Sequence, residues 1–212
     1  AVDNATGVAA VIELARVFAA GPRPQRTLLF MALTAEEKGL QGATYYAANP
    51  LTPLAKTAAV LNIEMLSPDG PTHDIASWGN GRVSLEGDLK RVAEARGRTY
   101  SPDPNLEAGF FYRADHFAFA RAGVPAITVG AGLDRVEGGV AGGKALRDAY
   151  FAKCYHQPCD AWTDGWDARG QAQDVEILHA LGREIADGAT WPHWREGSEF
   201  EATRARSDAE RK

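Results

Sequence analysis

The 212-residue sequence has few of the features that mark membrane-spanning or nucleic-acid-binding proteins. No apolar run approaches the roughly 20 residues that a transmembrane helix needs, so we expect no membrane span. Lysine and arginine are scattered and the formal net charge is −5, which argues against nucleic-acid binding. No internal repeat is found. The length and the 45% hydrophobic content indicate one globular domain with a substantial core.

Cysteine is also scarce, with Cys154 and Cys159 as the two examples. Their spacing allows either a short disulfide loop in an oxidising compartment or two free thiols in a reducing one, and both interpretations stay open. The sequence begins at "AVDNATG" without a methionine, and we expect this point to lie within a domain. A targeting segment could therefore have preceded it, and the lack of a signal peptide carries little information.

Strands are predicted to alternate with helices along the chain. Apolar runs predict buried strands at 26–34, 57–66, 73–79 and 124–130. Apolar residues at helical spacing predict helices at 6–20, 36–50, 84–97, 115–122 and 174–188. We interpret the glycine-rich stretch 130–143 as a mobile loop and the charged stretch 196–212 as a surface helix or a disordered tail. The alternation predicts an α/β fold, a mostly parallel mixed sheet flanked by helices on both faces.

Polar side chains that could bind a metal stand near the predicted strand ends, where ligands bind in open parallel sheets. They are Asp3, Glu36, Glu37, Glu64, Asp115, His116 and, in the motif "YHQPCD", His156. Carboxylates gathered in this way would repel one another unless a cation or protons compensated their charge. Carboxylate and imidazole groups together suit zinc.

Each of these residues also has a structural interpretation when it is taken alone. Asp3 could cap the first helix, and Glu36 and Glu37 could favour the positive end of a helix dipole. His156 could be an ordinary hydrogen-bonded histidine. Glu64 is harder to explain in this way, because a carboxylate in an apolar strand is rare unless it is paired. The remaining histidines are interpreted as structural or surface residues: His73, His179 and His193.

Five segments in order give the sequence a resemblance to a known family. They are "VDNATGVAAVIELAR", "FMALTAEEKGLQGATYYA", "LNIEM", "FYRADHFAFARAGVPAI" and "YHQPCD". Together they resemble the M28 family of zinc metallopeptidases, which includes bacterial aminopeptidases and glutamate carboxypeptidase, with the glutaminyl cyclases as relatives. The resemblance covers about residues 1–190 and implies one catalytic domain there, followed by a polar tail at 191–212.

The resemblance also implies a role for each metal-binding candidate. Asp3 matches the aspartate that bridges two zinc ions, and the Asp3–Asn4 peptide bond is expected to be cis. Glu37 and His156 match the ligands of the first zinc, and Glu64 matches a ligand of the second. Glu36 matches the general base, which takes a proton from the attacking water and delivers it to the leaving amine.

Further residues are expected around the reacting groups. Tyr155 is the first candidate for the donor that stabilises the oxyanion, and Tyr112 is the second. Asp115 and His116 match a motif that lines the family's pocket, where they are expected to hydrogen-bond to the residues that contact metal or substrate. Arg113 could pair with a substrate carboxylate or serve as a structural counter-ion.

The sequence departs from the family in three places. The second-zinc histidine of the family lies in an H-x-D motif upstream of the bridging aspartate, whereas two residues precede Asp3 here. We therefore expect the chain to lack the first strands of the fold, with the missing part belonging to a longer protein or to a second chain. Glu64 stands where aspartate is common, and Ala114 stands where serine is common. The first zinc site is complete, and the second has Asp3 and Glu64.

The leading functional hypothesis is a zinc-dependent exopeptidase, most simply an aminopeptidase, that acts on peptide substrates and is secreted or periplasmic. Two zinc ions are expected in a complete family site. A one-zinc acyltransferase of the glutaminyl cyclase type is an alternative, to which Trp78, Trp162 and Trp166 lend some support. A non-catalytic member or fragment is a third hypothesis, because relatives such as transferrin receptor keep the fold without the metal ligands.

Overall fold

Four strands form one mixed sheet in the computed structural model, which describes residues 1–79, 81–103, 105–209 and 211. The strands are β1 (Val60–Ile63), β2 (Asp74–Trp78), β3 (Thr99–Ser101) and β4 (Ala126–Ala131), in the spatial order β1-β4-β2-β3. β1 is parallel to β4 and β2 is parallel to β3, whereas β2 and β4 are antiparallel. Apolar runs of this kind form buried strands because helices cover both faces of the sheet.

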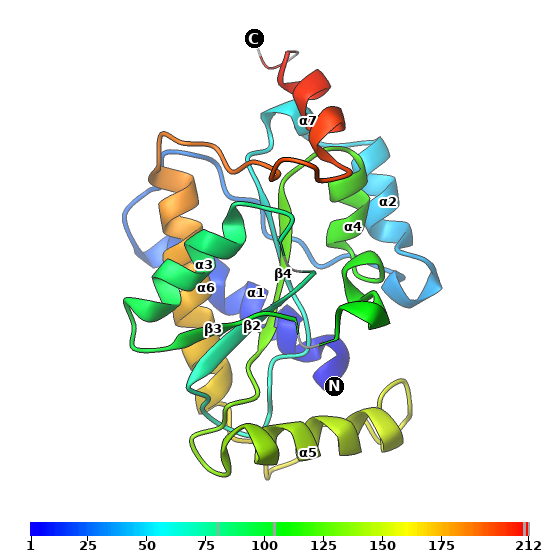
Figure 1. Ribbon diagram of the computed structural model, residues 1–212, viewed down its shortest axis with the longest axis vertical. Coiled ribbons are helices and arrows are strands. Elements are labelled where there is room, and N and C mark those ends of the chain that lie inside the picture. Colours follow the sequence, from blue (N-terminus) through cyan, green and yellow to red (C-terminus); the bar gives the residue numbers. More distant parts are fainter. Residues whose placement is uncertain (80, 104, 210, 212) are drawn as a thin grey trace.

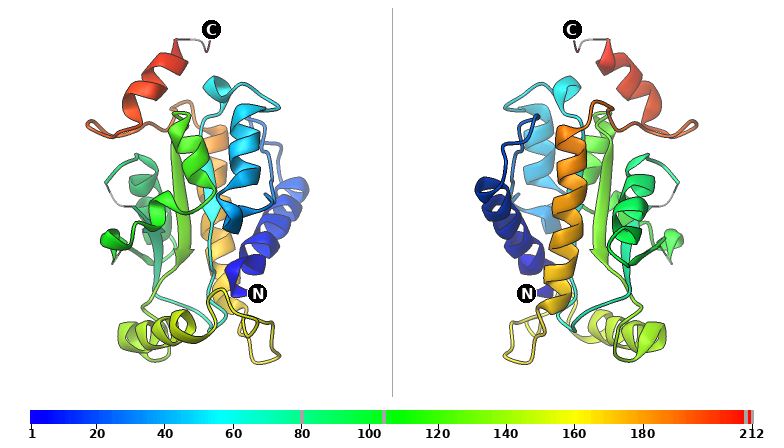
Figure 2. Two further views of the ribbon diagram at one scale, coloured as in Figure 1. Left: turned by 90° about the vertical axis from the view of Figure 1, so that its right-hand side faces the viewer. Right: turned by 90° about the vertical axis from the view of Figure 1, so that its left-hand side faces the viewer.

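Helices lie on both faces of this sheet (Figures 1 and 2). They are α1 (Val2–Ala20), α2 (Gln41–Ala48), α3 (Leu85–Glu94), α4 (His116–Arg121), α5 (Gly139–Lys153), α6 (Arg169–Asp187) and α7 (Glu201–Asp208). α6 packs against both α1 and α3 on one face, and α2 packs against α4 on the other. The predicted α/β class, with a mixed sheet between helices, is confirmed. None of the helices in the described part of the chain is long and apolar enough to cross a membrane.

The main core lies between the sheet and the layer of α1, α3 and α6. Its most deeply buried side chains include Leu66, Ile75, Leu85, Ile127 and Leu181. A smaller cluster of Ala43, Phe119 and Val124 fills the space beneath α2 and α4. The two cores pack helices onto both faces of the sheet.

The predicted strand at 26–34 is wrong, because this segment is extended but is not part of the sheet. β1 forms the edge of the described sheet, and among the described residues no backbone hydrogen bonds join the run to it. Leu28 still packs against the main core, whereas 52% of Leu29 and 38% of Phe30 remain exposed. The apolar pattern of this segment therefore reflects the burial of one side against the core, not pairing with a strand.

Two other segments differ from expectation. The glycine-rich composition of 130–143 predicts a mobile loop, but residues 130–131 belong to β4 and residues 139–143 to α5, so the prediction is wrong at both ends of the stretch. The family resemblance implies that residues 191–212 form a polar tail. Trp194 and Phe200 of this segment are 4% and 6% exposed and belong to the main core, and α7 follows them.

Candidate metal centre

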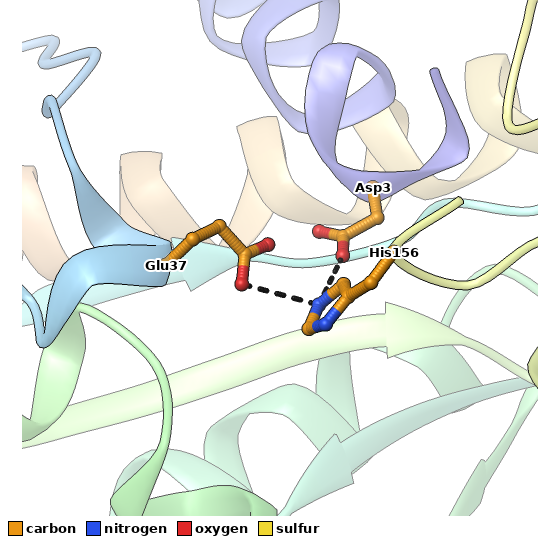
Figure 3. A group of neighbouring side chains, drawn as sticks. All are labelled: Asp3, Glu37 and His156. Carbon is orange, nitrogen blue, oxygen red and sulfur yellow. Dashed lines mark ion pairs between the residues drawn. The ribbon is translucent and has the colours of Figure 1, made fainter. Parts of the chain in front are cut away.

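Three side chains from distant parts of the chain converge at one point (Figure 3): Asp3, Glu37 and His156. The Nε2 atom of His156 lies 3.2 Å from Oδ2 of Asp3 and 3.1 Å from Oε2 of Glu37. One potential ligand atom from each residue lies within 4.8 Å of the other two. The structure thus brings together the three residues assigned to the first zinc site by the resemblance.

Asp3 is held by the irregular start of α1. The backbone at Asp3 and Asn4 is not helical, and the peptide bond between them is cis, as the resemblance implies. Asn4 connects this turn to the end of β1, since its Nδ2 donates to the carbonyl of Ile63 and its Oδ1 accepts from the amide of Met65. A Cβ atom on Gly7 would lie 2.6 Å from that same Ile63 carbonyl, so glycine is required for this close approach.

Glu37 lies in a single 3₁₀ turn, η1 (Glu36–Lys38), that follows the extended run 26–34. The turn is closed by a hydrogen bond from the amide of Leu40 to the carbonyl of Glu36. Gly42 packs so closely on Thr34 that a Cβ atom would lie 2.6 Å from the Thr34 carbonyl. The side chain of Glu37 is 51% exposed and reaches the cluster from the solvent side.

His156 is carried by the loop between α5 and α6, with a positive φ of 58°. A disulfide between Cys154 and Cys159 closes this loop around it, which resolves the two alternatives for the cysteines. The ring of Tyr155 stacks on the imidazole with 3.8 Å between the ring centroids. The disulfide and the stacked ring together limit how far His156 can move.

The cluster opens into a cavity of about 500 Å³. The candidate residues that line it are Asp3, Glu36, Glu37, Glu64, Tyr112, Arg113, Tyr155 and His156. Glu64 lies outside the three-residue cluster, although it shares the cavity. The hydroxyl of Tyr112 accepts a hydrogen bond from Arg82, and the guanidinium of Arg113 lies 5.9 Å from the ring of Phe110.

The carboxylates of this cavity hold protons more tightly than usual. Burial, then the charge of Glu37, raises the pKa of Glu36 to about 7 and also raises the pKa of Asp3. Burial raises the pKa of Glu64 to about 8. Negative charges gathered in a low-dielectric site favour either protons or a cation. A donor set of two carboxylates and one imidazole within reach of one ion is chemically suited to zinc, so these residues fit the metal that the resemblance implies.

Asp115 and His116 lie beside this cavity but do not line it. Burial raises the pKa of Asp115 to about 6. His116 is fully buried, and its Nδ1 lies 2.7 Å from the hydroxyl of Thr128. Thr128 also accepts a hydrogen bond from Asn62, whose amide donates to Glu64. His116 is thereby joined to the Glu64 carboxylate through two intermediate side chains.

Aromatic residues that were not assigned to the site also line the cavity. Trp78 and Phe110 form one wall, with their ring centroids 5.3 Å apart. Trp162 and Trp166 pack against each other and are not among the lining residues. Trp78 ends β2 and Phe110 lies in a 3₁₀ turn at Phe110–Tyr112. An aromatic side chain at either position is equally compatible with a core position, so residue type gave no signal for Phe110.

The other histidines lie away from the cluster. His73 lies 3.5 Å from a carboxylate oxygen of Asp134 near the surface, and His179 packs against the ring of Phe18. His193 is exposed, and its backbone amide donates to the hydroxyl of Ser84.

The mixed sheet and the carboxylate–imidazole cluster define an α/β domain with a candidate metal centre. The family model for peptidase family M28 matches residues 1–178, which is most of the chain. The chain therefore belongs to peptidase family M28, and the predicted resemblance is confirmed.

Several individual proteins are similar to this chain. Leupeptin-inactivating enzyme 1 of Streptomyces exfoliatus is 31% identical over 183 residues, which cover 84% of this chain and 40% of that protein. A probable zinc metalloprotease of Pyrenophora tritici-repentis is 30% identical over 199 residues, or 90% of this chain and 43% of that protein. The chain thus spans about two fifths of the length of these relatives.

A solved aminopeptidase from Aneurinibacillus sp. strain AM-1 has a similar fold. The TM-score is 0.63 at 24% sequence identity, and the match covers 87% of this chain and 39% of the other. At this identity the likeness establishes the fold of the described residues rather than the reaction.

Proposed function

We propose that this chain is the catalytic part of a zinc-dependent exopeptidase, an aminopeptidase that removes N-terminal residues from peptides. The observation that carries the proposal is the convergence of Asp3, Glu37 and His156 beside Glu36 in one cavity. Membership in peptidase family M28 supports peptide substrates, and the names of several relatives support zinc.

The residues of the cavity have different proposed roles. Asp3, Glu37 and His156 would hold the first zinc ion, and Glu64 could contribute to a second. A zinc ion in such a site supplies Lewis acidity, which acidifies water and polarises the scissile carbonyl. Glu36, next to the ligand Glu37 in η1, takes the proton of the attacking water and passes it to the leaving amine. Its pKa of about 7 suits a group that must accept and release a proton near neutral pH.

Tyr155 is the proposed donor that stabilises the oxyanion. It lines the cavity beside His156, and burial together with the charges of Asp3 and Glu37 raises its pKa to about 12. The phenol therefore keeps its proton at neutral pH and can donate a hydrogen bond. Removal of one such donor from an oxyanion site typically costs about 100- to 1,000-fold in rate.

The proposal is tested by metal content and by hydrolysis of aminoacyl nitroanilides, with Glu36→Gln as the decisive variant. Glu36→Gln keeps the size of the side chain but removes the base, and kcat is expected to fall about 100- to 10,000-fold. Zinc content should be unchanged, because Glu36 is not one of the ligands. An exposed glutamate of α6, Glu176, provides the matched control, and Glu176→Gln should leave both quantities as they are.

Four results would contradict the proposal in different ways. Full activity in Glu36→Gln would remove the assigned base. One zinc without peptidase activity, combined with cyclisation of an N-terminal glutamine, would favour a glutaminyl cyclase. Neither metal nor activity would indicate a non-catalytic chain. Equal hydrolysis of substrates with free and acetylated N-termini would contradict the aminopeptidase assignment, because an aminopeptidase must recognise the free amine.

We also propose that the protein is secreted or periplasmic. The Cys154–Cys159 disulfide supports this location, since disulfides form and persist in oxidising compartments. Fractionation of the source cells, followed by detection of the chain with an antibody, tests the proposal. Recovery with the cytosolic fraction would contradict it.

A further inference from the structure

Asp160, the last residue of "YHQPCD", is a buried carboxylate to which the proposed mechanism gives no role. Its side chain is 8% exposed. The Oδ1 atom accepts a hydrogen bond from the amide of Val2 at 2.7 Å, and Oδ2 accepts one from the amide of Asp3 at 3.0 Å. The hydroxyl of Tyr150 donates to Oδ2 at 3.2 Å. All of these contacts join Asp160 to the backbone that carries Asp3 or to α5.

These contacts require a carboxylate rather than an amide. The two backbone amides of Val2 and Asp3 are donors, and each uses a different oxygen of Asp160. Asparagine has one acceptor oxygen and one amino group, so one of the two amides would face another donor. A donor that is shielded from water and has no acceptor is unfavourable, so this short segment is expected to move until the amide finds another partner.

Asp160 is also connected, through the chain, to the loop that carries His156. It directly follows Cys159, whose disulfide to Cys154 closes the loop that presents His156. The same seven-residue segment, 154–160, therefore supplies one ligand of the cluster and fixes the backbone of another. Nε2 of His156 lies 3.2 Å from Oδ2 of Asp3, so movement of either segment changes the distance between the two ligands.

We propose that Asp160 is a positioning residue that sets the distance between Asp3 and His156 and thereby tunes metal affinity. It acts through the backbone amides of Val2 and Asp3, and Tyr150 supports it from α5. The inference rests on the proposed function in so far as the bound ion is zinc.

The test compares zinc binding by the wild-type chain and by Asp160→Asn, with zinc alone as the probe and a fluorescent chelator as competitor. Loss of an outer partner of a metal ligand typically weakens affinity by about 10- to 100-fold, and this range is expected here. The visible absorption spectrum of bound Co²⁺ should also change, because the Asp3 carboxylate would meet the ion at a different angle. A merely structural role would lower the melting temperature without changing this spectrum.

Asp74 provides the matched control. It is likewise buried, and its carboxylate accepts hydrogen bonds from the backbone amides of Leu133 and Asp134, but it does not line the cavity. Asp74→Asn should lower stability and leave zinc affinity and the Co²⁺ spectrum unchanged. Equal zinc affinity in wild type and Asp160→Asn, or equal losses in both variants, would overturn the proposal.

Amide hydrogen exchange separates this proposal from the proposed function. In the metal-free protein the amide of either Val2 or Asp3 should exchange faster in Asp160→Asn than in wild type, because asparagine leaves one of the two without an acceptor. If wild type binds no zinc, the proposed function fails, and unchanged exchange at both amides would overturn the positioning role as well. Should Asp160→Asn fail to fold, Tyr150→Phe removes one donor to Oδ2, and unchanged exchange and zinc affinity in that variant would overturn the proposal.

Discussion

Replacement of His116 by glutamine is expected to reduce the acid sensitivity of folding. His116 is fully buried, contacts Thr128 through Nδ1, and meets the ring of Phe111 edge-on at 4.7 Å between centroids. Burial lowers its pKa from 6.5 to about 3. The folded protein therefore holds a neutral imidazole at pH values where the unfolded chain binds a proton.

The size of the effect follows from these two pKa values. Because the folded-state pKa is lower, stability is complete above pH 6.5 and is lost as the pH falls toward 3. Each pH unit within this window costs up to about 1.4 kcal/mol, and the loss by pH 5 is about 2 kcal/mol. At pH 5 this figure depends almost entirely on the unfolded-state value, because a folded-state pKa anywhere below about 4 gives the same result.

The assay is urea unfolding of metal-free protein at pH 7 and pH 5, for wild type and for His116→Gln. Glu36, Glu64 and Asp115 have raised pKa values and so act with the opposite sign, since acidification favours their protonated folded forms. The comparison between the two proteins cancels this contribution. The free energy of unfolding should fall by about 2 kcal/mol more in wild type than in the variant between these pH values. Equal losses would refute the assignment of a neutral buried imidazole.

Two further predictions concern stability. Arg98 and Asp174 form a buried ion pair 2.8 Å apart. Asp174→Ala should lower the free energy of unfolding in urea by about 3–5 kcal/mol, because a buried cation loses its partner. A loss below 1 kcal/mol would contradict this, and the exposed Asp164→Ala is the control. Replacing Cys154 and Cys159 by serine should cost about 2 kcal/mol from loop-closure entropy, and unchanged thermal unfolding would contradict that expectation.

The sequence was informative where residue type and spacing carried a local physical signal. Apolar runs located β1, β2 and β4, and helical spacing located α3 and α6, because buried elements need such patterns. The α5 helix was missed since it carries several glycines and has large exposed apolar residues such as Val140 instead of a clean apolar stripe. The extended run at 26–34 was mistaken for a strand because burial on one side and strand pairing give the same pattern.

The candidate site shows a similar division. The residues that converge in the cavity were selected from carboxylate and histidine positions and from the family resemblance, and Asp3, Glu37 and His156 do lie together. The contacts that hold them could not be predicted, because they connect residues about 60 and 160 positions apart, such as Asn4 with Ile63 and Asp160 with Val2. Residue type alone does not specify which buried amide a carboxylate will meet.

The three proposed ligands stand on irregular segments, so each needs an anchor of its own. Asn4 ties the first to β1, the close packing of Gly42 on Thr34 shapes the turn of the second, and the Cys154–Cys159 disulfide restrains the third. Changes to these anchors should weaken metal binding before they affect any rate constant, because they alter ligand distances rather than proton transfer. Changes to Glu36 should do the reverse. In one series of variants, substitutions at the anchors are therefore expected to change metal affinity, whereas substitutions at Glu36 are expected to change kcat.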